Sequence, residues 1–428
     1  TVMASYHPLS RECVDDSIAG VVALEESGEV LSCGSFPAAT PHHAVAWLDS
    51  QSGALRRAIE LSAAPRACQV LESGYVLVGS SVGLQCFSAS GVKVWDLPAL
   101  QHVKGLSPAR GDRVAALTEN GTVAVVTENG SLLAHRRFGY DAITSVELFS
   151  DGRVVVGAFT NNWASNPVQI ARVEIYSKDL QTRLTQTWGQ LTAAELDAAR
   201  NMADTRIYSL AISKDEVYVY AAGESAGGNT IFRYNGRDLV TKTARDTGTP
   251  MWMAKSAAHI GYIARIRSSD GEVETGTFVA PILQSKNRLN TFRTRDGGLV
   301  HDARNAAVYL TGTSACCLAD RETMTFAGQI VGGYAGSDAS LVVFSEALDK
   351  RLLWTTFGAD RNKGKPATLT LNDSQLAIGV VMDGGTAITT EMSAQRTPPD
   401  SEPCGTSTKP NKDAWVGVVP TGHLLPAS

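Results

Sequence analysis

Short stretches in which apolar and polar residues alternate recur along the whole chain, separated by polar turns. The clearest unit begins at Ile143 and runs ITSVELF, then the turn Ser150-Asp151-Gly152, then RVVVGAF, QIARVEIYS and RLTQTWG. A period of two residues, rather than 3.6, indicates strands with one buried face. Each unit therefore predicts a sheet of four short antiparallel strands.

The second strand of this unit ends near a glycine in most copies. These glycines are Gly34, Gly79, Gly157, Gly223, Gly312 and Gly379. A glycine there permits the close approach of neighbouring backbones that a crowded centre requires. The third strand recurs seven times, from HAVAWLDS near the start to AWVGVVP near the end. Seven copies of a four-stranded unit predict an all-β fold, a seven-bladed β-propeller.

Residues 1–428 are expected to form this one domain. The blades are expected to begin near Asp16, Pro65, His102, Asp141, Arg206, Arg288 and Lys365. The seventh unit lacks a complete fourth strand, and TVMASYH within residues 1–12 has the alternation to supply it. We expect residues near Val2 to Tyr6 to pair beside Trp415 to Val419 and close the ring, which removes two exposed edges. A longer C-terminus is the alternative.

Loop lengths divide the ring into two halves. The loop between second and third strands is short in the first three units, but it expands to NNWASNP in the fourth and to long insertions in the fifth, sixth and seventh. Because strand direction alternates, these loops share one face with the blade-to-blade connectors. The connector after the fourth unit contains Thr192 and Glu195 in a capping box, which predicts a short helix.

Long loops on a rigid scaffold are frequent binding sites. Trp163, Trp252 and Tyr334 lie in these loops and are the candidate binding residues, with packing against the ring as the alternative role. His42 and His43 are neighbours at a strand entry and point to opposite sides, so they do not predict a metal site.

The stretch SDASLVVFSEALDKRLLWTTFGADRNKG begins at Ser337, and DAWVGVVPTGHLL begins at Asp413. Both start with an Asp-Ala strand, and the first continues to L-L-W-x-T-x-x-G. These units resemble the bacterial β-propeller repeat abbreviated SBBP. The resemblance implies an extracytoplasmic, often surface-associated protein whose family shares no catalytic residues.

Composition excludes several partners. The net charge is -5 and no basic stripe is evident, so nucleic acid is not an expected partner. The longest apolar runs fall short of the roughly 20 residues that a membrane-spanning helix needs. No motif for a metal or a cofactor occurs, and none is expected.

Several features suggest an extracellular or cell-surface location. The chain opens at Thr1 without Met, as expected after removal of a signal peptide or after trimming. Three N-x-[ST] sequons, at Asn120, Asn129 and Asn372, lie in predicted turns and are candidate glycosylation sites.

Cysteine positions lead to a second expectation about the compartment. Cys316 and Cys317 lie in the sixth long loop and Cys404 in the seventh. Because adjacent blades place these loops side by side, we expect a disulfide between Cys404 and one of the vicinal pair, with free thiols as the alternative. The cysteines on predicted strands are expected to be ordinary buried thiols, namely Cys33, Cys68 and Cys86.

Two classes of function fit these observations. The first is a secreted interaction or structural module whose loops on blades four to seven bind another extracellular protein or a glycan. The alternative is a carbohydrate-active enzyme, a polysaccharide lyase or glycoside hydrolase, with its site at the mouth of the channel. No G-x-S-x-G or H-E-x-x-H motif occurs, so no catalytic residue is assigned. Polar residues for such a mouth site are His259, His301, Asp302 and Asp320.

Overall fold

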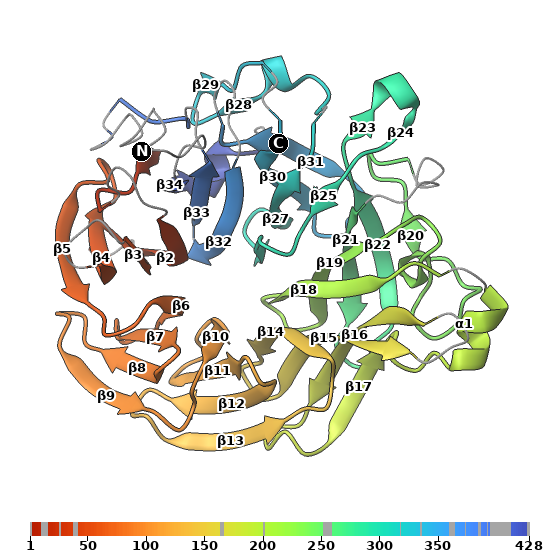
Figure 1. Ribbon diagram of the computed structural model, residues 1–428, viewed down its shortest axis with the longest axis horizontal. Coiled ribbons are helices and arrows are strands. Elements are labelled where there is room, and N and C mark those ends of the chain that lie inside the picture. The colour runs from red at the N-terminus through yellow and green to blue at the C-terminus, as the bar shows by residue number, and fades with distance from the viewer. Residues whose placement is uncertain are drawn as a thin grey trace, which may run out of the picture.

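The computed structural model is a ring of seven β-sheets arranged around one axis (Figure 1). The structure describes residues 2–9, 16–24, 27–36, 42–162, 167–199, 202–250, 259–316, 318–333, 336–358, 364–372, 374–383, 387–391, 393 and 412–425. The predicted seven-bladed propeller of four-stranded antiparallel sheets is confirmed. Within the described residues, every helix is too short or too polar to span a bilayer.

Blades one to four each hold four strands in chain order from the centre to the rim. Blade one is β2 (Ser17–Leu24), β3 (Glu29–Ser35), β4 (His43–Asp49) and β5 (Leu55–Glu60). Blade two is β6 (Pro65–Val70), β7 (Val76–Ser80), β8 (Gly83–Phe87) and β9 (Lys93–Leu97). Blade three is β10 (Val103–Leu106), β11 (Arg113–Thr118), β12 (Thr122–Thr127) and β13 (Leu132–Arg137). Blade four is β14 (Ala142–Leu148), β15 (Val154–Asn162), β16 (Val168–Tyr176) and β17 (Arg183–Thr187).

Blades five to seven depart from this plan. Blade five is β18 (Thr205–Ile212), β19 (Tyr218–Ser225), β21 (Ile260–Arg267) and β22 (Val273–Val279), with β20 (Ala244–Arg245) added outside. Blade six is β25 (Phe292–Arg293) and β26 (Leu299–Asp302), then β27 (Ala307–Ser314), β30 (Asp338–Ser345) and β31 (Arg351–Thr356). Blade seven is β32 (Gly364–Asn372), β33 (Gln375–Asp383), β34 (Lys412–Pro420) and β1 (Met3–Tyr6).

Short elements lie outside the blades. They are α1 (Ala193–Ala199), the hairpins β23 (Ile282–Leu283) with β24 (Arg288–Leu289) and β28 (Thr325–Phe326) with β29 (Gln329–Ile330), and the 3-10 turns η1 (Ile231–Arg233), η3 (Gln284–Lys286), η4 (Arg321–Thr323) and η5 (Thr421–His423). The capping box ahead of α1 is formed, since the Thr192 amide donates to Glu195 Oε2 at 2.7 Å. Arg288, expected to begin the sixth blade, pairs with Leu283 in a hairpin instead.

Three of the recurring glycines, Gly79, Gly157 and Gly379, lie where adjacent blades come close together. A Cβ on Gly79 would lie 2.5 Å from Val103 Cγ1, on the inner strand of the next blade. A Cβ on Gly379 would lie 2.9 Å from Ile18 Cγ2, on the inner strand of blade one. These separations are shorter than carbon atoms tolerate, so a side chain at either position would push two blades apart.

The N-terminal strand closes the ring, as the alternation of its sequence predicted. β1 pairs antiparallel with β34, with Met3 opposite Val418 and Tyr6 opposite Trp415. The ladder continues through the His7 amide, which donates to Ala414 O at 2.8 Å. Segments more than 400 residues apart in the chain thus share blade seven.

Neighbouring blades are joined near the rim by one recurring kind of hydrogen bond. A side chain on the fourth strand of one blade donates to a backbone carbonyl in the turn before the fourth strand of the next. The pairs are Arg57 to Ala89, Trp95 to Glu128, Arg136 to Leu180 and Thr187 to Gly271, at 2.6 to 2.9 Å. Each such bond satisfies a turn carbonyl and fixes the angle between two blades.

The insertions of blades five to seven cover the outer edges of these blades. β20 pairs in parallel with β22, the fourth strand of blade five. Thr355 Oγ1 on β31 donates to Thr325 O in the blade-six insertion at 2.8 Å. The Thr390 amide, from the blade-seven insertion, donates to Ala4 O on β1 at 3.0 Å. The described parts of these loops therefore lie along the rim.

A buried arginine anchors the insertion of blade six. The guanidinium of Arg321 is 2% exposed and donates to Asp338 Oδ1 at 2.8 Å. It also donates to the carbonyl oxygens of Val331, Gly332 and Gly333. A buried cation that is paired and fully hydrogen-bonded holds the loop in one conformation.

One disulfide joins blades one and two, and it corrects the expectation of buried thiols. Cys33 on β3 is bonded to Cys68 on β6, with a Cα–Cα distance of 6.5 Å. Gly20 permits this approach, because a Cβ there would lie 2.9 Å from the Cβ of Cys68. Cys86 is a buried free thiol, and burial raises its pKa to about 12. Cys316 is also free, whereas Cys317 and Cys404 lie outside the described residues.

Replacing Ser5 with proline should open the ring. The alternation set by the His7 amide turns the Ser5 amide toward β34, and proline removes that donor inside a buried ladder. We expect Ser5→Pro to lower the free energy of unfolding by about 3 kcal/mol, from the lost bond and an unsatisfied carbonyl. Urea denaturation measures this, and an unchanged midpoint would show that β1 does not hold blade seven.

Non-reducing peptide mapping should recover two peptides joined by a disulfide, one containing Cys33 and the other Cys68. In the loop-entropy account, a cross-link between residues 35 apart stabilises the fold by about 4 kcal/mol. The double variant Cys33→Ala/Cys68→Ala should lose a comparable amount in urea denaturation, with Cys86→Ala as the single-thiol control. The same map tests the predicted bond between Cys404 and one of the vicinal pair Cys316 and Cys317, of which Cys316 is a free thiol in the structure. Alkylation of Cys33 and Cys68 without reduction would contradict the assignment.

Candidate functional site

The aromatic residues predicted to bind a partner, Trp163, Trp252 and Tyr334, lie outside the described residues. The two histidine and aspartate pairs proposed for the channel mouth separate onto opposite faces. His259 and Asp320 lie in loops between second and third strands, whereas His301 and Asp302 lie at the end of the inner strand β26. The sequence alone predicts all four residues at one mouth of the channel.

The ends of the inner strands line a cavity of about 510 Å³ at one mouth of the central channel. Five blades contribute to it through the turns between their first and second strands. The lining residues are Arg110, Ser150, Ile212, Lys214, Asp215, Glu216, His301, Asp302, Ala303, Arg304 and Leu371. This mouth opens on the face opposite the long loops, because first-to-second turns alternate with second-to-third loops.

The carboxylates in this cavity are engaged in holding its turns. Asp302 is 1% exposed and accepts from the amides of Arg304 and Asn305 at 2.9 and 3.2 Å. Asp215 Oδ1 accepts from the Ser213 hydroxyl at 2.6 Å, which is the main cause of the lowered pKa of that carboxyl. The acids therefore act first as caps for the loops that carry them.

Two cationic side chains of the cavity, Lys214 and Arg304, form no such structural contacts with the described residues. Among the described residues, the side-chain heads of Lys214 and Arg304 have no hydrogen bond or ion pair, and both residues are exposed. His301 is buried instead, stacked on Tyr220 and 3.1 Å from Glu346 Oε1. The cavity is polar and charge-balanced, which suits water or a small polar ligand better than an apolar one.

His259 on the opposite face belongs to a structural ion cluster. Its Nδ1 lies 3.4 Å from Glu224 Oε2, and Arg293 lies 3.1 Å from the same oxygen. Glu224 Oε1 accepts from the amides of Thr294 and Arg295 at 2.9 and 3.2 Å. Partial burial, followed by the nearby Arg293, lowers the pKa of His259. The cluster fixes the connector between blades five and six.

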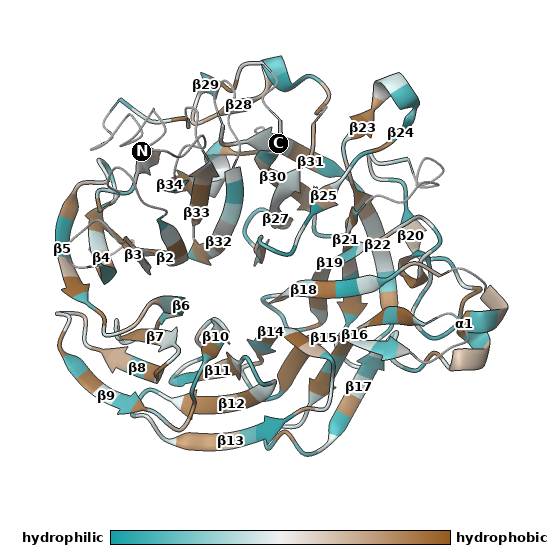
Figure 2. Cartoon of the chain, viewed as in Figure 1, coloured by the Kyte–Doolittle hydropathy of each residue, from teal (hydrophilic) through white to brown (hydrophobic). Residues whose placement is uncertain are grey.

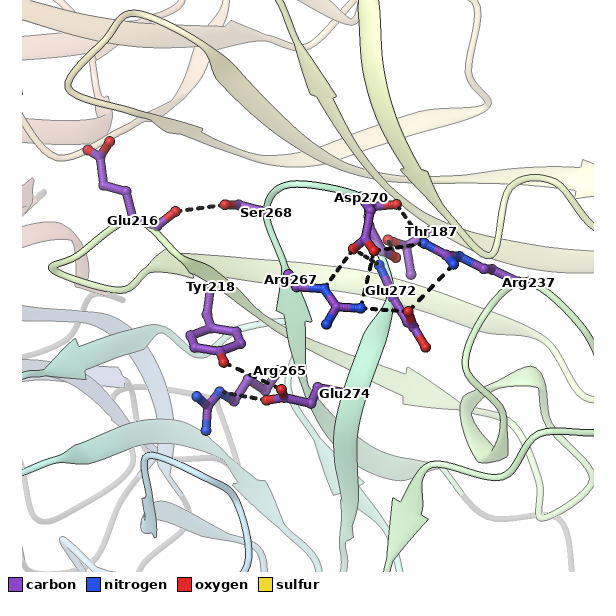
Figure 3. Close-up of polar contacts among 11 residues, drawn as sticks. Thr187, Glu216, Tyr218, Arg237, Arg265, Arg267, Ser268, Asp270, Glu272 and Glu274 are labelled. Atoms are coloured by element: carbon purple, nitrogen blue, oxygen red, sulfur yellow. Dashed lines mark hydrogen bonds and ion pairs between the residues drawn. The ribbon is translucent and has the colours of Figure 1, made fainter.

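A second ion cluster fastens the blade-five insertion to the edge of that blade (Figure 3). Arg237, from the insertion, lies 3.1 Å from Asp270 and 3.5 Å from Glu272. Arg267 bridges the same two carboxylates at 3.1 and 2.6 Å. Positive and negative charges balance in this group, so it serves cohesion rather than attraction of a charged ligand.

The outer rim of blades one to four differs from the rest of the molecule. Three exposed large apolar side chains of the blades lie in turns, namely Val82, Val92 and Val217. Among the described strands of the blades, the exposed ones all belong to fourth strands of these four blades. They are Leu55, Val94, Leu132, Leu133 and Leu184. The chain's own insertions lie along the other rim, so the uncovered edges β5, β9, β13 and β17 form what we call the open rim.

Sequence reasoning missed the open rim because it weighed loop length and not strand exposure. One signal was available: Leu132 and Leu133 are consecutive, which breaks the alternation of a strand with one buried face. The structure places a β-bulge there, where the register of β12 and β13 shifts between Val125 and Val126.

No family model and no curated protein matches the chain. Among solved structures it is similar to the one titled "Crystal structure of RRP9 WD40 repeats", with a TM-score of 0.52 and 9% sequence identity. The match covers 98% of this chain and 99% of that one. At this identity the similarity shows the fold alone, which is a β-propeller.

The three predicted glycosylation sites differ in exposure, and the described residues form no metal-binding cluster. In the described residues, no three His, Cys, Asp or Glu side chains gather as a metal would require. Asn120 and Asn129 are exposed in the turns at either end of β12, and each side-chain oxygen accepts from a backbone amide two residues later. Asn372 lies at the end of β32 and is half-buried.

One buried acid near the cavity has an unusual proton affinity. Glu147 lies on β14 and is 8% exposed. Burial raises its pKa to about 8, and the nearby Arg110, which lines the cavity, opposes the shift. The folded protein therefore prefers the neutral acid at pH values where the unfolded chain is ionised.

This preference predicts a pH-dependent stability. The contribution of Glu147 is fully present below an unfolded pKa of about 4.3 and is lost as pH rises through the folded pKa. Glu147→Gln keeps the neutral form, so we expect equal stability at pH 4 and a gain of about 5 kcal/mol at pH 8.5. Urea denaturation at both values measures this, with the exposed Glu60→Gln as the control. A variant that is less stable at pH 8.5 would contradict the burial argument.

Proposed function

We propose that this chain is a secreted or cell-surface β-propeller that binds another protein through the open rim. The observation that carries the proposal is that, among the described strands of the seven blades, exposed large apolar side chains occur only on the fourth strands of blades one to four. Exposed apolar side chains at unpaired strand edges favour association, and soluble proteins usually protect them.

Burial of the exposed apolar side chains of the open rim could supply the free energy that a specific interface needs. Leu133 is 56% exposed and Val94 is 48% exposed. Full burial of an aliphatic side chain contributes about 1.5 to 3 kcal/mol, so a few such contacts suffice for a specific interface. The chain covers its other edges with its own insertions, which supports the view that the open edges are left for a partner.

The long loops of blades four to seven are the other candidate surface, for a protein or a glycan. Their described parts are engaged with the rim, through β20 on β22 and through Thr325 and Thr390. Two apolar side chains remain exposed on them, Val240 and Ile330. We therefore place the partner on the open rim and use these loop residues as the comparison.

An extracellular or surface location is supported by the disulfide between Cys33 and Cys68, since such bonds persist in oxidising compartments. The exposure of Asn120 and Asn129 is compatible with glycosylation there. The enzyme alternative has less support, because Asp302 and Asp215 in the channel-mouth cavity cap their own turns. A general acid and base pair needs carboxylates free to exchange protons with a substrate.

The proposal is tested by affinity capture from the native source with the tagged full-length chain. We expect the double variant Val94→Asp/Leu133→Asp to capture about one tenth as much partner as the wild type, or less. The reason is that two apolar side chains buried in the complex become charged. Val240→Asp and Ile330→Asp, on the insertions, should retain it as the wild type does.

Three results would contradict the proposal. Loss of the partner with the insertion variants alone would place the site on the long loops. The absence of any partner enriched by the wild type would remove the interaction role. Turnover of a polysaccharide by the purified chain would favour the enzyme alternative. Circular dichroism of each variant confirms that it is folded.

A further inference from the structure

The four edges of the open rim are not equivalent in charge. On β5, Arg56 lies 2.6 Å from Asp49 and Arg57 lies 3.5 Å from Glu29. On β9, Lys93 lies 3.2 Å from Asp96. The basic residue of β17 also has a carboxylate partner, Arg183 with Glu174 at 3.5 Å. Each of these three edges neutralises its own cations.

On the edge β13, by contrast, the basic side chains are not paired with carboxylates of the described residues. It ends in His135, Arg136 and Arg137, and none of them forms an ion pair with a described residue. Arg136 donates to the carbonyl oxygens of Leu180 and Gln181, which leaves its charge uncompensated. A basic strand within a chain of net charge -5 is a local exception. Figure 2 shows the same strand changing from hydrophobic at its start to hydrophilic at its end on the outer rim.

The backbone of β13 offers hydrogen bonds to an additional strand. The Phe138 amide donates to Gly121 O on the β12 side at 3.1 Å. By the alternation of an antiparallel ladder, the amides and carbonyls of His135 and Arg137 point the opposite way, out of the sheet edge. The bulge at Leu133 lies before this segment and leaves Ala134 to Arg137 in regular pairing. Two residues thus present two donors and two acceptors to a partner.

The chain itself already adds a strand to a blade in this way. In blade five, β20 pairs outside β22 with Ala244 opposite Gly276 and Arg245 opposite Thr277. The fourth strand of a blade in this ring therefore accepts a fifth strand without opening the sheet. No described segment of the chain occupies the corresponding place beside β13.

We propose that β13 is the docking edge for an extended acidic segment of a partner protein, which adds as a fifth strand to blade three. This inference rests on the proposed function and narrows it to one edge and one chemistry. Main-chain bonds to His135 and Arg137 supply affinity, and carboxylates facing these two side chains, which lie on the same face of the sheet, supply selectivity. Apolar residues of the segment would cover Leu132 and Leu133, which are both exposed.

The test uses the full chain and a fluorescent ten-residue peptide of alternating glutamate and valine, with a lysine and valine peptide as the charge control. We expect saturable binding of the acidic peptide alone, weakened by added salt. His135→Pro removes an outward amide while sparing the ladder to β12, and Arg137→Gln removes one charge. Each should weaken binding about tenfold or more, which corresponds to 1.4 kcal/mol. Arg56→Gln on β5 is the matched control and should bind as the wild type does.

Each other outcome overturns the inference in a recognisable way. Equal binding of both peptides would exclude the charge argument, and full binding by His135→Pro would reduce the site to a diffuse charged surface without strand addition. If no peptide binds while the captured partner still depends on Val94 and Leu133, the docking edge is wrong and the proposed function stands. If partner capture is independent of those residues as well, both fall. Thermal denaturation shows that His135→Pro is folded, and Arg137→Gln tests the same edge independently.

Discussion

The pairing of β1 with β34 is the constraint on which the rest of this structure depends. Seven sheets around one axis form a ring only if the last blade is complete, and its fourth strand comes from the opposite end of the chain. Once Met3–Tyr6 is in place, blade seven packs against blade one and the inner strands meet at glycines such as Gly379. Every later feature, including the channel-mouth cavity, is positioned by this closure, because its lining residues come from five separate blades.

The need to cover unpaired strand edges also determines which part of the rim is available to a partner. A fourth strand has an unpaired edge, and the chain covers that edge in blades five and seven with β20 and with Thr390. In blades one to four, side chains of the rim form hydrogen bonds between neighbouring blades, such as the bond from Trp95 to the Glu128 carbonyl. These bonds stiffen the ring and leave the outward backbone of β13 unused. A rigid scaffold with a pre-formed edge loses little entropy when a partner strand binds.

The sequence predicted the fold well because each blade corresponds to one local repeat of the sequence. Alternation, turn residues and the glycine of the second strand are properties of each unit alone, and the closing strand followed from counting them. The bond between Cys33 and Cys68 was missed because it joins two blades, and nothing near either residue reveals how adjacent sheets face each other. The cavity escaped for the same reason, since short turns from five blades build it. Exposure of Leu133 on β13 depends on where the neighbouring blade ends, which the pattern of one strand does not contain.

We propose that the open rim of blades one to four binds the partner protein. The most direct measurement is hydrogen–deuterium exchange of the full chain with and without its captured partner. On binding, we expect protection of the fourth strands of blades one to four, with the largest change at the outward amides of His135 and Arg137. Protection confined to the insertions of blades five to seven, or to the turns around Lys214 and Arg304, would contradict it.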